Sequence, residues 1–420
     1  MMADVRNPGD FDLAIAGGGL VGASLALALA PLGLRIALVE AVAPAAGSGE
    51  HPSFDERTTA LANGTVRVFR SLDVWRHMQR EATAIRRIHI SEQGRFGVAR
   101  IDAEEQGLEA LGYVLPNRVI GAGLWEGLRR VTGVETYAPA RVTGTELAAD
   151  RRTLTIERDG QALEIRAKLV VAADGARSVI REQAGIPAEH WQYGQTAIIA
   201  TLTTQRFHDH VAYERFTPEG PIAVLPLSDG RCGLVWTRHP EAAARLLALP
   251  DAEFLAELQT AFGFRLGRLL RVGTRHSYEL ALSRAEGHVA PRLAIVGNAA
   301  QALHPIAGQG FNLGLRDAAS LAEVIDDAMS SGQTDVGDEA LLRSYADWRD
   351  EDQRRIVAFT DGLVRLFATP LGAMRGLRSL GLLAFDSFPP AKAAMSRLSV
   401  GAAGRVPKLA RGVPLAGGGR

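Results

Sequence analysis

The chain has 420 residues, of which 47% are hydrophobic and 22% charged, which suits two or three globular domains. Its 47 basic and 47 acidic residues balance, so the composition gives no reason to expect a nucleic acid partner. The single cysteine, Cys232, excludes an internal disulfide, a CxxC pair and a thiolate metal cluster, and we predict no metal site. Because no charged start followed by a long apolar run is found at the N-terminus, we predict a cytoplasmic protein.

Residues 11–40 predict a strand, a glycine turn, a helix and a second strand. The turn reads Gly17-Gly-Gly19-Leu20-Val21-Gly22, and this GxGxxG pattern between a strand and a helix is typical of dinucleotide binding. Glu40 ends the second strand, where a carboxylate can accept hydrogen bonds from ribose hydroxyls. Its negative charge favours an unphosphorylated ribose, so the pattern predicts FAD or NAD rather than NADP.

Two further strand ends carry glycine. A strand from Lys168 ends at Asp174-Gly175, where a carboxylate can lie beside free backbone N–H groups; an ordinary helix cap at Asp174 is the alternative. A strand from Leu293 ends at Gly297-Asn298, and a helix is predicted to begin near Phe311. Its N-terminus, with Gly308 and Gly310 allowing close backbone approach, suits an anionic group.

Two arginines are candidates for the same nucleotide. Arg57 could reach a phosphate with two hydrogen bonds if its loop folds back over the first glycine turn. Arg118 lies just before a helix predicted over Gly123–Val131 and is a second candidate. The spacing leaves a solvated arginine equally open at position 57.

The remaining chain predicts an antiparallel sheet and C-terminal helices. Strands are expected over Ala197–Thr203, Val211–Phe216, Ile222–Leu227 and Cys232–Thr237, with Asp229-Gly230 as a hairpin turn. Helices are predicted over Asp251–Phe262 and Leu341–Phe367. Residues 371–420 hold eight basic residues and one acidic residue among apolar ones, and could lie on a membrane surface, dock on a partner, or pack on the protein itself.

The three glycine turns, in this order, resemble those of class A flavin monooxygenases of the para-hydroxybenzoate hydroxylase type. More narrowly, Asp55-Glu-Arg57-Thr-Thr-Ala-Leu and the stretch from Gly297 to Asp317 resemble the ubiquinone-biosynthesis FAD-dependent hydroxylase family. Within it they look most like the 2-octaprenyl-6-methoxyphenol hydroxylases. The wider class usually has Gly-Asp where this chain has Gly297-Asn298, and the Asn298 oxygen can still accept from a ribityl hydroxyl.

The resemblance implies an α/β fold with a Rossmann-like FAD-binding domain (1–180 and 285–345), an inserted antiparallel β-sheet substrate domain (181–284) and a C-terminal helical region (346–420). It implies FAD as cofactor, NAD(P)H as transient reductant, and hydroxylation of a polyprenylated phenol by O2 through a flavin C4a-hydroperoxide. Pro305 would lie by the flavin ring edge. His304 is a candidate acid or base, although a structural role is favoured.

The same resemblance places cofactor contacts on both sides of the last turn, including Phe311 and Asn312. Other ubiquinone-biosynthesis proteins would be possible partners, and the basic tail could hold the protein at the inner membrane face. Two other functions stay open: a flavin reductase or dehydrogenase acting on an isoprenoid, and a non-catalytic FAD-containing lipid-binding subunit.

Overall fold

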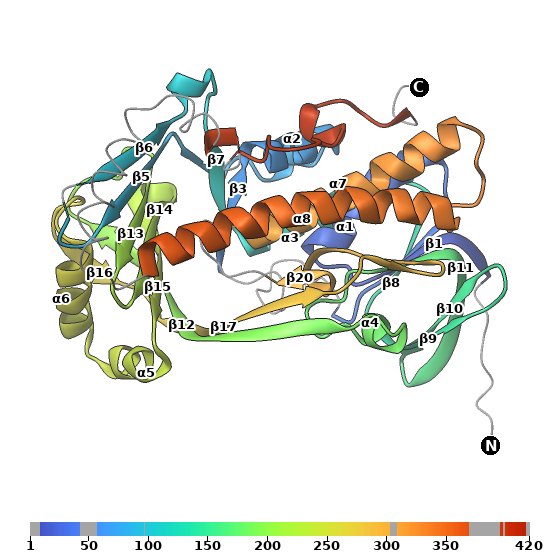
Figure 1. Cartoon of the computed structure of the whole chain (residues 1–420), viewed down its shortest axis with the longest axis horizontal. Coiled ribbons are helices and arrows are strands. Elements are labelled where there is room, and N and C mark those ends of the chain that lie inside the picture. The colour runs from blue at the N-terminus through green and yellow to red at the C-terminus, as the bar shows by residue number, and fades with distance from the viewer. Residues whose placement is uncertain are drawn as a thin grey trace.

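The computed structural model describes residues 9–42, 57–95, 97–302, 309–368, 395–397 and 400–416. Figure 1 shows two sheets at opposite ends of an elongated molecule, with the long helix α8 (Glu339–Ala368) running between them. The described chain contains no helix long and apolar enough to cross a membrane. Among these residues no group of three or more His, Cys, Asp or Glu side chains is placed to hold a metal ion.

The first sheet has a parallel centre. Its main strands, in spatial order, are β18 (Val289–Ala290), β19 (Leu293–Ile295), β11 (Gln161–Ala172), β1 (Asp10–Ala16), β2 (Ile36–Val39) and β8 (Val134–Tyr137). The strands β9 (Arg141–Leu147) and β10 (Arg152–Arg158) extend β11. Apolar side chains alternate between two cores on its faces, since Leu13 and Ile15 join one and Ala14 and Ala16 the other.

Helices cover one face of this sheet. The first core contains side chains from α1 (Leu20–Leu29), α3 (Asn117–Leu128), α7 (Gln309–Ser330) and α8. The second core, on the other face, contains Leu154 and Ile156 of β10 and Ile180 of the short α4 (Val179–Gln183). This is the doubly covered arrangement that buries a parallel sheet, and it confirms the predicted α/β fold.

The second sheet is mostly antiparallel and has nine strands. They are β5 (Arg87–Glu92), β6 (Val98–Asp102), β12 (Ala188–Thr204), β13 (Val211–Thr217), β14 (Gly220–Pro226), β15 (Arg231–Arg238), β16 (Leu269–Val272), β17 (His276–Ala285) and β20 (Gln301–Ala302). One face packs on α5 (Pro240–Ala248) and α6 (Asp251–Phe262). Cys232 is fully buried there, and burial raises the pKa of its thiol to about 11.

A small third sheet lies between the two large ones. Its strands are β3 (Thr58–Ala62), β7 (Gly112–Pro116) and β4 (Thr83–Ile85), and α2 (Asn63–Ser71) follows β3. The described part of the C-terminal tail packs on this region. Leu409 and Leu415 are buried, and Lys408 pairs with Asp326 at 2.9 Å. Arg405 lies over the ring of Trp348, with its guanidinium carbon 3.7 Å from the ring centroid.

Most predicted elements are confirmed. The helix Asp251–Phe262 has the predicted bounds, and Asp229 and Gly230 turn the β14–β15 hairpin with positive φ values of 59° and 69°. The predicted helix Gly123–Val131 instead runs over Asn117–Leu128. The division at residues 180 and 285 stays a prediction. Strands β5 and β6, which precede residue 180, pair into the antiparallel sheet through β13.

Candidate active site

A single cavity of about 960 Å³ runs from the parallel sheet to the antiparallel sheet. One end is formed by the three glycine turns predicted from the sequence. These turns follow β1, β11 and β19, which are neighbours in the sheet and end in register at Ala16, Ala172 and Ile295. Loops at the carboxyl ends of adjacent parallel strands meet at one edge, which is the usual ligand site of such sheets.

The first turn packs too closely for side chains. A Cβ on Gly17 would lie 2.4 Å from the carbonyl oxygen of Ala173, and its φ of 102° is one that other residues rarely adopt. A Cβ on Gly22 would lie only 1.9 Å from the carbonyl oxygen of Gly17. Gly19 precedes α1, Leu20 and Val21 are the first residues of α1, and all three line the cavity. The first N–H groups of α1 therefore face a space where an anionic group can bind.

Glu40 lies at the end of β2 and is 8% exposed. Its carboxylate accepts hydrogen bonds from the N–H of Gly18 at 2.7 Å and from the N–H of Val42 at 3.0 Å. It also lines the cavity. The side chain thus fixes the glycine turn while it presents a negative charge at the position predicted for ribose.

Asp174 and Gly175 form the second turn and line the cavity. The Oδ1 atom of Asp174 is buried and has no hydrogen-bond partner among the described residues. Burial raises the pKa of its carboxyl, against hydrogen bonds from Ser178 and from nearby backbone N–H groups. The helix cap that the sequence offers as the alternative at Asp174 is also present, because Asp174 accepts from the backbone N–H groups of Val179 and Ile180, and Ser178 accepts from the N–H of Arg181. Asp174 thus both caps α4 and lines the cavity.

The third turn rests on a buried ion network that the sequence analysis did not find. The N–H of Gly297 donates to Asp317 Oδ2 at 2.9 Å, and Asp317 Oδ1 accepts from Arg349 Nε at 2.8 Å. Arg349 also pairs with Asp352, which pairs with Arg316. Arg349 and Asp317 are both fully buried. The network joins the turn to α7, to α8 and, through Arg316, to backbone carbonyls of the tail.

The predicted residues around the third turn are brought to the cavity wall. Asn298 is exposed toward it, and Gly310 and Phe311 line it at the start of α7. Asn312 also lines it, but its side chain holds β3 and α2 in place: it accepts from the N–H of Ala62 at 2.9 Å and donates to the carbonyl of Ala60 at 2.9 Å. His304, Pro305 and Gly308 lie outside the described residues.

The two arginines predicted to contact the nucleotide lie in different places. Arg57 lines the cavity, with its guanidinium carbon 5.0 Å from the centroid of the Tyr278 ring on β17. Arg118 pairs with Glu81 at 2.8 Å in an exposed bridge, and it is not among the described residues that line the cavity. Its predicted cofactor role stays a prediction, with this pairing against it.

The far end of the cavity is apolar. It is the face of the antiparallel sheet opposite α5 and α6, and its apolar side chains come from seven strands: Ile88, Ile90, Ile101, Ala197, Ile199, Ala212, Ala223, Leu225, Val235 and Leu280. Such a surface binds a hydrophobic molecule and excludes water from it.

These features fit FAD. The glycine turns leave backbone N–H groups open to a pyrophosphate, Glu40 stands where a ribose would lie, and the buried Asp174 oxygen lacks a partner. The family model described as "FAD binding domain" matches residues 10–360. FAD is therefore the cofactor.

The chain belongs to the ubiquinone-biosynthesis FAD-dependent hydroxylase family. Ubiquinone hydroxylase UbiL of Rhodospirillum rubrum is 40% identical over 408 residues, which cover 96% of this chain and 93% of that protein. The 3-demethoxyubiquinol 3-hydroxylase of Escherichia coli is 33% identical over 89% of this chain and 94% of its own length. Human ubiquinone biosynthesis monooxygenase COQ6, mitochondrial, is 30% identical over 91% of each chain.

Solved structures agree on the fold. The p-nitrophenol 4-monooxygenase PnpA of Pseudomonas putida superposes with a TM-score of 0.75 and 21% identity, covering 94% of this chain and 98% of that one. PqsL of Pseudomonas aeruginosa gives a TM-score of 0.72 at 21% identity, over 90% of this chain and all of that one. The class A flavin monooxygenase fold expected from the sequence is confirmed.

Proposed function

We propose that this protein hydroxylates the aromatic ring of a polyprenylated phenol in ubiquinone biosynthesis, using FAD, NAD(P)H and O2. The observation that carries the proposal is the single cavity, because it joins the three glycine turns directly to a water-excluding apolar wall. A ring with a long apolar substituent matches that wall, and a flavin held at the turns would reach into the same space. The named activities of the relatives support the same assignment.

The residues have separable roles in this proposal. The turn at Gly17 and the N-terminus of α1 bind the pyrophosphate, Glu40 binds a ribose, and Asn298 with Asp174 contacts the polar parts of the cofactor nearer the ring. Bound FAD supplies the two-electron chemistry that activates O2. The start of α7 at Gly310 and Phe311 places positive dipole ends where negative charge develops. The apolar sheet face holds the substrate ring and keeps water away from it.

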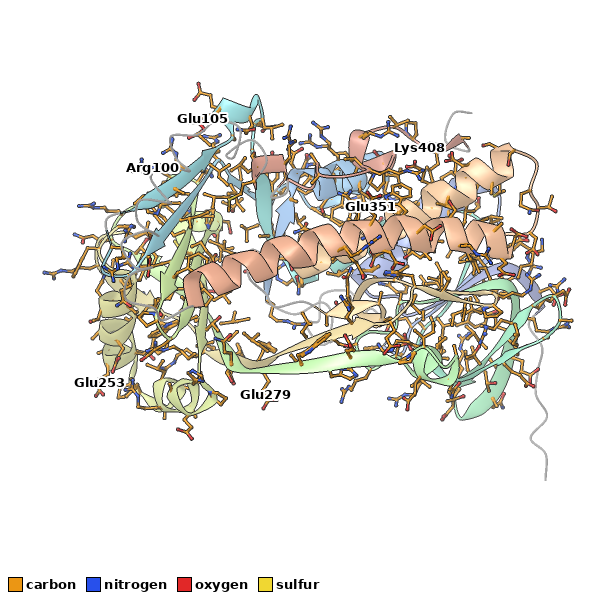
Figure 2. The ribbon with its side chains drawn as sticks, in the orientation of Figure 1. Arg100, Glu105, Glu253, Glu279, Glu351 and Lys408 are labelled. Carbon is orange, nitrogen blue, oxygen red and sulfur yellow. The ribbon has the colours of Figure 1, made fainter. Side chains whose placement is uncertain are left out.

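Finer points belong to the proposal as well. The likeness of the Gly297 to Asp317 stretch favours the 2-octaprenyl-6-methoxyphenol branch of the family. Contact with the inner membrane face through residues 371–420, and with other proteins of the pathway, would deliver a substrate that is insoluble in water. Within the described part of the tail, however, Lys408, labelled in Figure 2, already pairs with Asp326 and Asp327, so that stretch packs on the protein itself.

The test is anaerobic reduction of the yellow FAD-loaded protein by NADPH and by NADH, with and without a short-chain prenyl methoxyphenol. We expect the phenol to accelerate reduction, and we expect the aerobic product to carry one added oxygen atom on the ring. Fast reduction that ignores every phenol would instead indicate a reductase acting on another substrate. An absence of reduction by either nucleotide, with a range of phenols, would indicate a non-catalytic lipid-binding subunit.

A further inference from the structure

Glu214 is an acidic residue on the apolar wall of the cavity. It lies in the middle of β13, where Ala212, Glu214 and Phe216 all line the cavity. Arg215 of the same strand points to the other face, where its Nε donates to the carbonyl of Ala261 at 2.9 Å. Because side chains alternate along a strand, the carboxyl of Glu214 belongs to the substrate side of the sheet.

Its direct partners on the two adjacent strands are apolar. The residues beside it in the sheet are Ile90 on β5 and Ala223 on β14, and both line the cavity. Within the described chain the Glu214 carboxyl makes no hydrogen bond or ion pair, and burial alone raises its pKa to about 8. The carboxyl is thus held in apolar surroundings without compensation.

The ionisable groups that share this side of the sheet do not change that conclusion. Glu92 on β5 pairs with Phe216, two residues after Glu214 on β13, so its side chain is on the same face of the sheet as that of Glu214. Tyr278, with Arg57 over its ring, is on β17, and β14 presents only Pro221, Ala223 and Leu225 to this side. None of these groups contributes to the shift of the Glu214 pKa.

An unpaired carboxyl in an apolar wall destabilises the fold unless a ligand brings it a hydrogen-bond partner. A polyprenylated phenol is apolar except for its oxygen substituents, and its ring hydroxyl is the hydrogen-bond donor. We propose that Glu214 binds the aromatic substrate by accepting the hydrogen of a ring hydroxyl, and takes that proton to form the phenolate. In this step the phenol O–H bond breaks and a carboxyl O–H bond forms, with no change of oxidation state.

The assignment rests on the proposed function and deepens it, since it names the base of that reaction. A phenolate ring is more electron-rich than a phenol and accepts an electrophilic oxygen more readily. A carboxyl with an ordinary pKa near 4.3 would take a proton from a phenol of pKa about 10 with an equilibrium constant of roughly 10⁻⁶. At the raised pKa of about 8 that constant is roughly 10⁻². By raising the pKa of the Glu214 carboxyl, burial brings it closer to the pKa of the phenol, and proton transfer between them becomes less unfavourable.

The test compares Glu214→Gln, Glu214→Leu and Glu214→Asp with the wild type, all loaded with FAD. The control is Glu253→Gln, which changes an exposed acid on α6, behind the other face of the same sheet (Figure 2). Two quantities are measured: the affinity for a short-chain prenyl methoxyphenol and for its methyl ether, followed by the flavin absorbance, and the pH profile of kcat/KM.

We expect the wild type to bind the phenol at least about tenfold more tightly than the ether, and the Glu214→Leu protein to bind both nearly equally. The wild-type kcat/KM should rise with pH and level off above about 8. In Glu214→Gln the rise of kcat/KM with pH should disappear, and kcat/KM should fall about 10²–10⁴-fold. Glu214→Asp should keep the pH-dependent rise, and Glu253→Gln should behave as the wild type.

The assignment would be overturned, while the proposed function stands, if Glu214→Gln still preferred the phenol over its methyl ether as the wild type does and kept the wild-type pH profile of kcat/KM. A wild type that binds and hydroxylates no phenol would overturn both.

Discussion

The two ends of the cavity are built by opposite means. At the turns end, the proposed cofactor contacts come from backbone groups, and the geometry of the turn is set by glycines that admit no side chain, such as Gly17 and Gly22. At the sheet end, side chains from seven strands make an apolar wall around the carboxyl of Glu214, which has no partner among the described residues. The first end is made for a cofactor whose phosphates any such enzyme must hold. In the proposed function the second end selects the substrate, because only side chains distinguish one ring from another.

The largest expected effect is the loss of FAD when a side chain is added to the first glycine turn. In Gly22→Ala the new Cβ would lie 1.9 Å from the Gly17 carbonyl oxygen, so the backbone of the turn must move. We expect the purified protein to lose nearly all bound FAD, measured by absorbance near 450 nm against protein concentration. The turn joins β1 to α1 of the other sheet, so the strand signal of the antiparallel sheet should remain in the circular dichroism spectrum.

The matched control is Gly287→Ala. A Cβ at Gly287 meets no atom within 4 Å and its φ is not in the left-handed region. This variant should keep its FAD. Full FAD occupancy in Gly22→Ala would mean that the turn binds the cofactor in another way than its backbone geometry indicates.

The second expected effect is a loss of stability when the buried ion pair that supports the third glycine turn is broken. Arg349→Met leaves Asp317 buried without its charged partner, and breaking a buried ion pair costs about 3–5 kcal/mol. The loss is measured by urea unfolding of the FAD-loaded protein. Arg343→Met on the same helix removes an exposed pair with Glu339 and should cost less than about 1 kcal/mol. Equal losses for the two variants would show that the buried network does not support the fold.

The contrast between the two ends also explains what the sequence could predict. The glycine turns were found because their constraints are local: a strand, a tight turn and a helix follow one another within 30 residues. The Asp317–Arg349 pair joins residues 32 positions apart, on α7 and α8, and no local pattern indicates that they meet. The sequence predicts a helix that begins at Gly123, after Arg118. The helix begins at Asn117, so Arg118 lies in its first turn, where it pairs with Glu81.

Glu214 shows a different limit. The adjacent Glu214 and Arg215 have the appearance of a solvated strand, since charged residues are usually exposed. The two side chains lie on opposite faces of β13, however, since Arg215 is buried against α6 and Glu214 lines the cavity. Only the pairing of β13 between β5 and β14, strands more than 100 residues apart in the chain, reveals which side faces the substrate.

The smallest expected effect is a pH-dependent change in stability at the sheet end. Glu214 is protonated in the folded protein up to a pKa of about 8, whereas in the unfolded chain it ionises near 4.5. Between these values unfolding releases a proton, so the contribution of Glu214 to stability is present at low pH and is lost as the pH rises through about 8. Glu214→Gln cannot ionise and does not have this loss. The difference in melting temperature between Glu214→Gln and the wild type should therefore become more positive from pH 5 to pH 9. A constant difference across this range would mean that Glu214 is ionised or partnered in the folded protein, and that the sheet end is as polar as the turns end.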